Sequence, residues 1–546
     1  MTLSPQFRLV NLSFSCGTSH RGASLVAPFE SARTAREHCL SECNSYRAGA
    51  RVFSYAEAMT DPHDASTELA YLTAEEVRRR LDDHSLTSRQ LVDSLLERVE
   101  AIDVVGTPIS LNAIAATSDD ARALAQVRDD ERAQGISRGP LHGVPVLIKD
   151  NIEAIGLPAT AGSTSLVGRP TRDAPLVTRL RDAGAIILGS TNLSQWANMR
   201  SLRSSSGWSA TAGLVGNPWA LDRSAGGSSS GSGAALAAGL APLAVGTETD
   251  GSIVCPSSVN GLVGLKPTVG VVPATHVVPV SASQDSPGPM GRKVGDVALL
   301  FGVLSATSPN APSAVPTFSA ATNWRTGNPE TDERFDEVID TLRERGLYIV
   351  DRELAQPSSQ EYEDELAVLL GELSDDLSAY LAGRPGDGVA SLADVIAYED
   401  EHRSVEQPYF GHEFFTQALA TGGRGGSAYA DARRRNLEWA VDTCLTPGLE
   451  GVDVVLAPAY GPSWKSDLAV GGHPGPASVA TMAPAIAGWP ILSLPMGLVQ
   501  RLPVGLALIG RPASEWTMLE AARVIESVIS DVHPLPPPYW SAPQRG

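Results

Sequence analysis

The chain has 546 residues, of which 42% are hydrophobic, and 62 acidic against 42 basic residues give it a formal net charge of −20. This length and composition predict a large globular protein with a substantial core. The acidic excess repels phosphate backbones and anionic membrane surfaces, so we expect neither a nucleic-acid nor a membrane partner. Five scattered cysteines are too few for a disulfide framework, which favours a reducing compartment, and we expect the cytoplasm.

The first part of the chain is predicted to be a poorly ordered N-terminal extension over 1–65, because no period is sustained through residues 1–58. His38, Cys39 and Cys43 lie close together there, but no second ligand pair follows at a zinc-like spacing, so we expect no metal. Met59 opens a polar segment, and apolar packing signals begin near residue 66. We therefore predict that Met59 is a workable start of the chain.

From residue 66 to 530 the pattern is typical of one α/β domain, in which apolar runs alternate with helical periods. Apolar residues recur every three or four positions over 73–102 and predict a helix. Short apolar runs predict strands at 143–150, 183–191, 241–247, 452–461, 488–497 and 502–510. The acidic region at about 354–440 is expected to be a helical insertion, and residues 531–546 a Pro-rich tail.

Lysine is rare in this chain: it occurs only at 149, 266, 293 and 465, while arginine supplies the other basic residues. Arginine stays protonated in proteins, whereas a buried lysine can become neutral and accept a proton. Lys149 ends the apolar run VPVLIK, which suits a desolvated base. A buried lysine paired with a carboxylate is an equally good interpretation of its position.

A serine-rich stretch, SAGGSSSGSG at 224–233, precedes a helix predicted from about Ser230 to Leu240 and the strand at 241–247. A helix of eleven residues is about 16 Å long, and a strand of five or six residues that runs back toward the start of the helix has a comparable length. Ser228 and Ser252 are therefore expected to be neighbours. The turn between Thr249 and Ser252 offers successive backbone N–H groups that can hold an oxyanion.

An alternative nucleophile is Ser229, because the same loop contains the string G-x-S-x-G found at the nucleophile of α/β-hydrolases. That motif needs an apolar strand directly before it, and the polar segment NPWALDRSAG stands there instead. Two hydroxyls, a lysine and an oxyanion nest favour a hydrolase.

Several stretches resemble the amidase signature family: GGSSSGSG, GTETDGSIVCP, GLVGLKPTVG and VPVLIKDN, with further similar segments over about 66–530. The resemblance implies a mixed central β-sheet covered by helices on both faces. It implies that Lys149 is the base, Ser228 a bridging serine that follows a cis peptide bond, and Ser252 the nucleophile. No metal or organic cofactor is then required.

With these roles, the oxyanion is expected to rest on the N–H groups of Thr249, Asp250, Gly251 and Ser252. Ala197 and Asn198 match family segments that lie beside the substrate, whereas Lys266 and Lys293 match structural ones.

The segments NLSQWANMR, SGWS and GTETDGSIVCP are most similar to bacterial peptide amidases, which release ammonia from amidated peptides. The expected substrate is thus a small-molecule or peptide amide. The alternative is a glutaminase, the ammonia-donating component of a tRNA-dependent amidotransferase, which works with partner chains. The sequence leaves the particular amide and the oligomeric state open.

Overall fold

The computed structural model describes residues 65–103, 110–166, 168, 170–308, 318–384, 388–472 and 479–529. The expectations for residues 1–64, including the group at His38, Cys39 and Cys43, lie outside this part, as does the predicted tail at 531–546. In the described ranges, no helix combines the length and the apolar character that crossing a membrane requires.

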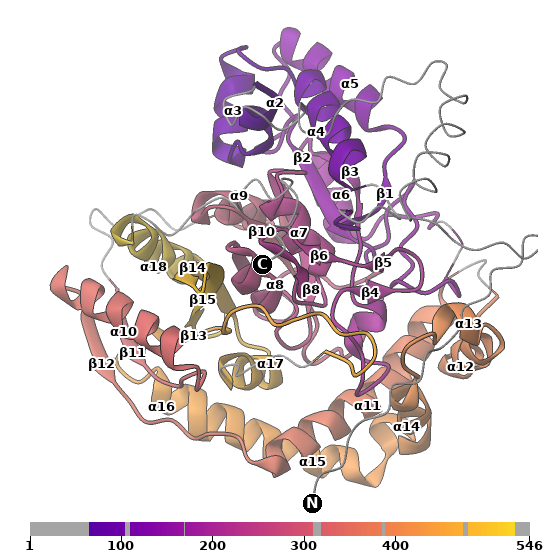
Figure 1. Ribbon diagram of the computed structural model, residues 1–546, viewed down its shortest axis with the longest axis vertical. Coiled ribbons are helices and arrows are strands. Elements are labelled where there is room, and N and C mark those ends of the chain that lie inside the picture. The colour runs from indigo at the N-terminus through magenta and orange to yellow at the C-terminus, as the bar shows by residue number, and fades with distance from the viewer. Residues whose placement is uncertain are drawn as a thin grey trace, which may run out of the picture. The chain divides into compact units, whose positions relative to one another are not determined.

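One mixed sheet of eleven strands organises the described domain, as the α/β prediction required (Figure 1). Its strand order is β1-β3-β2-β8-β10-β9-β14-β15-β13-β11-β12. The strands are β1 (Ile114–Thr117), β2 (Pro145–Lys149), β3 (Ile186–Thr191), β8 (Leu243–Glu248), β9 (Val263–Lys266), β10 (Ser286–Gly291), β11 (Ser319–Thr322), β12 (Tyr348–Asp351), β13 (Val454–Pro458), β14 (Ile491–Val499) and β15 (Leu502–Ile509). Two small antiparallel pairs are β4 (Trp208–Ser209) with β5 (Gly213–Leu214), and β6 (Gly216–Asn217) with β7 (Ala220–Ser224).

Strand β2 runs parallel to both of its neighbours, β3 and β8, whereas β10 runs antiparallel to β8 and to β9. The six apolar runs predicted as strands correspond to β2, β3, β8, β13, β14 and β15. Strand β10 was not predicted, because its sequence SPGPMG contains two prolines and two glycines.

Helices cover both faces of the sheet. The described helices are α2 (Ala65–Ala70), α3 (Ala74–Asp82), α4 (Ser88–Ile102), α5 (Ala121–Ala133), α6 (Pro175–Asp182), α7 (Ser230–Ala237), α8 (Val254–Asn260), α9 (Val294–Ser305), α10 (Pro329–Glu344), α11 (Ser359–Ala382), α12 (Leu392–Glu401), α13 (Arg403–Glu406), α14 (Glu413–Thr421), α15 (Ser427–Leu437), α16 (Thr446–Gly448), α17 (Met482–Ala487) and α18 (Glu515–Val528). On β10, Gly288 faces Ile253 at the start of α8, and Gly291 faces Asp296 of α9. Positions three apart on a strand point to opposite faces, so α8 and α9 lie on opposite sides of the sheet.

The helix predicted over 73–102 is in fact two helices, α3 and α4. The break comes from Thr87, whose side chain accepts a hydrogen bond from the backbone N–H of Gln90, while the Gln90 side chain accepts from the Thr87 N–H. This reciprocal pair caps a new helix and ends the continuous period.

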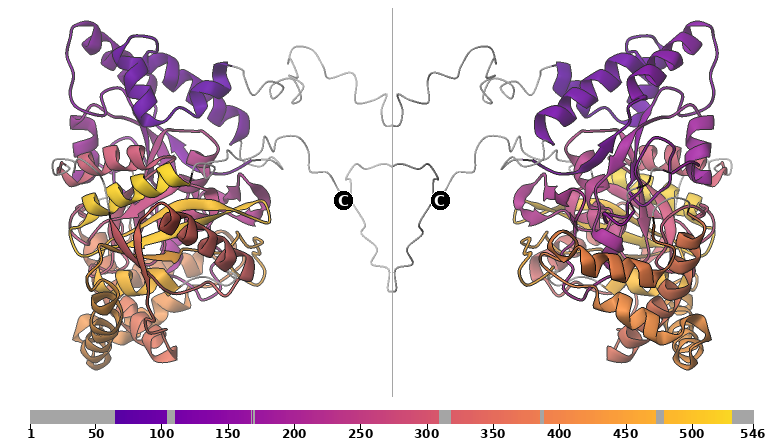
Figure 2. Two further views of the ribbon diagram at one scale, coloured as in Figure 1. Left: turned by 90° about the vertical axis from the view of Figure 1, so that its left-hand side faces the viewer. Right: turned by 90° about the vertical axis from the view of Figure 1, so that its right-hand side faces the viewer.

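The helices α11 to α15 lie within the region at about 354–440, and both views in Figure 2 show these orange helices side by side. Helix α11 packs against α14 and α15, and α12 packs against α14. Apolar side chains of α11, α12 and α14 share one buried cluster with Ala161, Leu166 and Trp196 of the sheet domain. The helical segment is thereby in contact with loops that follow β2 and β3.

Candidate active site

Lys149 lies where the interior strand β2 ends, and its side chain is 0% exposed. All five residues of β2 are buried between β3 and β8. Because β2 and β8 are parallel neighbours, their carboxyl ends meet at the same edge of the sheet. Thr247, near the end of β8, therefore lies beside Lys149.

The Lys149 amine is surrounded by oxygen atoms. Its Nζ donates to Ser228 Oγ at 2.8 Å, to Thr247 Oγ1 at 2.9 Å and to the Thr247 carbonyl oxygen at 3.2 Å. Burial lowers the pKa of Lys149 to about 7, while the negative charges of Asp285 and Glu248 oppose that shift. A lysine in this state is neutral in a large fraction of molecules near neutral pH.

The loop before α7 brings Ser228 to the lysine. Its side chain is fully buried, and the Gly227–Ser228 peptide bond is cis, as the family resemblance implied. The N–H of Ser194 donates to the Ser228 carbonyl oxygen at 3.1 Å. The N–H of Ser229 donates to the Ser252 carbonyl oxygen at 3.1 Å, so Ser252 adjoins this loop.

Ser229, the alternative nucleophile, makes contacts of a different kind. Its hydroxyl donates to the Thr247 carbonyl oxygen at 3.0 Å and accepts from the Thr247 N–H at 3.2 Å. Both bonds go to the backbone of β8. They tie the serine loop to the strand that carries the lysine's other two acceptors.

The turn after β8 contains Ser252, which is 7% exposed. It also contains Gly251, whose φ of 74° lies in the left-handed region. Glu248 stabilises this turn, because its Oε2 accepts hydrogen bonds from the backbone N–H groups of Ile253 at 2.6 Å and Val254 at 2.8 Å. The hydroxyl of Thr249 donates to Asp285 Oδ1 at 2.6 Å. These bonds hold Thr249, Asp250, Gly251 and Ser252 in one defined bend.

Buried charges support the turn. Lys266 Nζ donates to the Trp489 carbonyl oxygen at 2.8 Å, and burial lowers its pKa to about 8 against the pull of Glu248 and Asp250. Burial raises the pKa of Asp250, which hydrogen bonds with Thr481. Asp285 has a pKa raised to about 6 for the same reason. Sequence reasoning did not single out Thr247, Glu248 or Asp285, although all three stand inside the signature-like segments.

A cavity of about 350 Å³ adjoins this group. Its lining includes Asn151, Ala197, Thr247 and Thr249, and its remaining wall is largely apolar. Asn151 Nδ2 donates to Thr247 Oγ1 at 3.0 Å, and the cavity thus reaches Thr247, which contacts the lysine directly. Asn198 follows Ala197 in the chain, and its Nδ2 donates to Ser206 Oγ at 3.2 Å.

In the described part of the chain, no group of three or more His, Cys, Asp or Glu side chains is placed to hold a metal ion.

A family model described as Amidase matches residues 90–519, which include every element of this site. The chain belongs to the amidase family. It is therefore an amide-hydrolysing enzyme, and its α/β domain is that of amidase-signature enzymes.

Among curated proteins, a probable amidase of Arabidopsis thaliana is 34% identical over 488 residues, covering 83% of this chain and 89% of the relative. One of the subunits of the glutamyl-tRNA(Gln) amidotransferase of Anaeromyxobacter dehalogenans is 33% identical over 506 residues, covering 86% and 98%. Among solved structures, the native peptide amidase of Stenotrophomonas maltophilia is 37% identical with a TM-score of 0.77, covering 85% of this chain and 98% of that one.

Proposed function

We propose that this enzyme hydrolyses the terminal carboxamide of amidated peptides and releases ammonia, with Ser252 as nucleophile, Ser228 as proton relay and Lys149 as base. The observation that carries the proposal is the contact of 2.8 Å between the Ser228 hydroxyl and the amine of a completely buried lysine. The similarity to the peptide amidase of Stenotrophomonas maltophilia supports the choice of substrate class.

The acceptors around Lys149 suit a neutral amine. Its two N–H bonds match the carbonyl and hydroxyl oxygens of Thr247, and its lone pair then remains for the hydroxyl hydrogen of Ser228. A protonated lysine would instead donate to all three oxygens. Gain of one proton therefore reverses only the hydrogen bond with Ser228, which is the bond that the relay uses.

The reaction then proceeds by acyl transfer. Ser252 loses its proton to Ser228 as Ser228 passes its own to Lys149, and the Ser252 oxygen bonds to the amide carbon. The N–H groups of Thr249, Asp250, Gly251 and Ser252 stabilise the negative oxygen that forms. The C–N bond breaks as the amine nitrogen takes the proton back, ammonia leaves, and water hydrolyses the acyl-enzyme by the same relay.

The cavity beside the site would take the part of the substrate that adjoins the carboxamide. We place the substrate against Ala197, which lines the cavity, and its neighbour Asn198, whose amide contacts Ser206. The lining is largely apolar but includes Asp285 and Asp376, so it favours an apolar residue over an anionic one, because a negative charge would lose its hydration beside these carboxyl groups.

The test is ammonia release by the purified chain from amidated dipeptides, aliphatic amides, aromatic amides and glutamine, with Ser252→Ala as the blank. We expect amidated dipeptides to give the highest kcat/KM. Faster turnover of another amide by the wild-type chain would contradict the proposed substrate.

A glutaminase role is the second candidate, since the chain is 33% identical to the amidotransferase subunit of Anaeromyxobacter dehalogenans over almost the whole length of that subunit. Glutamine hydrolysis that appears only when the other amidotransferase chains are added would establish that role. Peptide-amide hydrolysis by the isolated chain would favour the first.

A further inference from the structure

A left-handed turn, Trp196–Asn198, forms part of the cavity wall. Trp196, Ala197 and Asn198 have φ values of 50°, 54° and 69°, and Ala197 lines the cavity. Three successive residues with a Cβ in this conformation are disfavoured, and they persist only where neighbouring groups hold them. Whatever holds this turn therefore also fixes the shape of the cavity.

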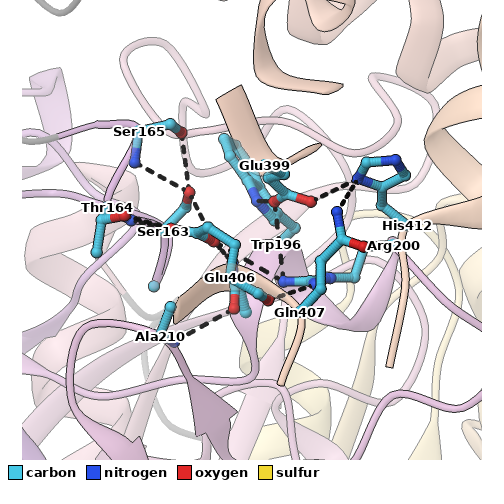
Figure 3. Close-up of polar contacts among 12 residues, drawn as sticks. Ser163, Thr164, Ser165, Trp196, Arg200, Ala210, Glu399, Glu406, Gln407 and His412 are labelled. Carbon is cyan, nitrogen blue, oxygen red and sulfur yellow. Dashed lines mark hydrogen bonds and ion pairs between the residues drawn. The ribbon is translucent and has the colours of Figure 1, made fainter. Parts of the chain in front are cut away.

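Two buried glutamates of the helical segment hold the turn (Figure 3). The indole Nε1 of Trp196 donates to Glu399 Oε1, on α12, at 2.9 Å. The amide Nε2 of Gln195, directly before the turn, donates to Glu406 Oε2, on α13, at 2.5 Å. Both carboxylates are 0% exposed, so neither bond competes with bulk water.

Glu406 also binds the loop that follows β2. Its Oε1 accepts from the Thr164 N–H at 2.7 Å and from the Thr164 hydroxyl at 2.5 Å. The Gln195 amide oxygen in turn accepts from the Ala210 N–H at 3.2 Å. Each oxygen of Glu406 thus faces at least one N–H donor, and only a carboxylate satisfies both sides.

Arg200 completes the arrangement from the sheet domain. Its Nη1 lies 3.8 Å from Glu399 Oε1 and 4.0 Å from Glu406 Oε2, and its Nη2 donates to the Glu406 carbonyl oxygen at 2.6 Å. His412 Nδ1 lies 2.9 Å from the other oxygen of Glu399. Buried charges of this kind tolerate little displacement, because each loses its partner when it moves.

We propose that Glu399 and Glu406 are positioning residues for substrate binding, through which the helical segment fixes the turn Trp196–Asn198 against the cavity. The inference rests on the proposed function only in its choice of substrate. The two glutamates act on substrate affinity through this turn, and they leave the proton relay at Lys149 untouched.

The test is Glu406→Gln, assayed for KM and kcat with an amidated dipeptide. The new NH₂ group of the amide would face either the Gln195 amide or the Thr164 N–H, both of which are donors. One hydrogen bond would be lost, so the turn should relax. We expect KM to rise at least tenfold while kcat changes less than threefold. Labelling of Ser252 by a small fluorophosphonate, which needs the relay but little of the cavity, should keep its rate within threefold.

A second substitution should rescue the first. In Gln195→Glu combined with Glu406→Gln, the carboxylate at 195 accepts from Ala210 and from the new amide, whose oxygen still accepts from Thr164. We expect KM to return within threefold of wild type. The matched control is Asp364→Asn, which weakens the ion pair of this buried carboxylate with Arg435 inside the same helical segment, and it should leave KM unchanged.

A wild-type KM in Glu406→Gln, or no recovery in the double variant, would overturn the proposal. If Glu406→Gln fails to fold, Trp196→Phe removes the indole donor together with part of the buried ring system, and a KM below twice the wild-type value would overturn the proposal equally. If the wild-type chain does not hydrolyse amidated peptides, the proposed function is wrong. The positioning role is then tested separately, by comparing the KM of wild type and Glu406→Gln for the aliphatic amide, aromatic amide or glutamine that the wild type hydrolyses fastest.

Discussion

Replacing Lys149 by arginine tests whether Lys149 acts as a base or only as a structural positive charge. The pKa of Lys149 is lowered to about 7, so about half of the molecules carry a neutral amine at pH 7. At the ordinary lysine pKa of 10.5, only about one molecule in 3,000 would carry a neutral amine at pH 7. An arginine side chain is neutral in fewer than about one in 100,000.

We therefore expect Lys149→Arg to lower kcat/KM by at least about a thousandfold, with the residual rate supplied by the oxyanion turn and substrate binding. Because the site is fully buried, the larger side chain also risks crowding Ser228 and Thr247. Lys149→Met is the matched control: it keeps similar length without charge and should lose as much activity. Circular dichroism and thermal unfolding would show that both variants are folded.

The pH dependence has a definite sign. Protonation removes the base, so the wild-type rate should rise about tenfold per pH unit below pH 7 and level off above it. The assay is initial ammonia release between pH 5 and 9 at low substrate concentration. Retention of more than a tenth of the activity in Lys149→Arg, or a flat profile below pH 7, would refute the assignment of Lys149 as the base.

Further changes test the nucleophile, the turn after β8 and the start of the chain. Ser252→Ala should abolish turnover and fluorophosphonate labelling, whereas Ser229→Ala should lower the unfolding temperature and keep activity within tenfold; an adduct on Ser229 would contradict this. Glu248→Ala leaves two backbone N–H groups unpaired, which costs about 1–3 kcal/mol each, so kcat should fall at least tenfold and Glu248→Gln should restore most of it. Deletion of residues 1–58 should leave kcat/KM within a few-fold, and an insoluble or inactive truncation would count against Met59 as a workable start.

The strands around the lysine were predictable because their sequences carry a strong local signal. Runs such as VPVLIK and AIILGS are apolar and rich in β-branched residues, and β2 and β3 lie within the predicted ranges. The proximity of Ser228 and Ser252 followed from matching helix and strand lengths. That argument needed only an approximate balance, and it tolerated a helix α7 of eight residues instead of eleven.

Strand β10 shows where local signals fail. Proline lacks an N–H donor and glycine weakens a strand, so SPGPMG is typical of a turn. In the structure it lies between β8 and β9, with Pro287 opposite Thr247 and Pro289 opposite Val245. A Cβ on Gly288 would stand 2.1 Å from the Leu265 carbonyl oxygen, so the close approach of β9 requires glycine there. Tertiary packing, which a single sequence does not reveal, decides this strand.

The contacts of Glu399 and Glu406 were beyond sequence reasoning for another reason. Helical periodicity predicts that their segment is helical, but it does not tell which helix face meets which loop. Trp196 and Glu399 are 203 positions apart, and Gln195 and Glu406 are 211 apart. Isolated polar residues inside helices usually face solvent, and only the assembled fold places these two away from it.

The interior position of β2 has a consequence for how the enzyme fails on heating. The strand is paired on both sides and wholly buried, and β3 separates it from the edge strand β1. Backbone amides in such a place exchange with solvent deuterium only when a large part of the fold opens. Deuterium should therefore enter β2 last, at the rate of global unfolding. Activity should persist nearly to the unfolding temperature and then be lost over a few degrees, because the strand that positions Lys149 beside Ser228 and Thr247 separates from its neighbours only when the sheet unfolds.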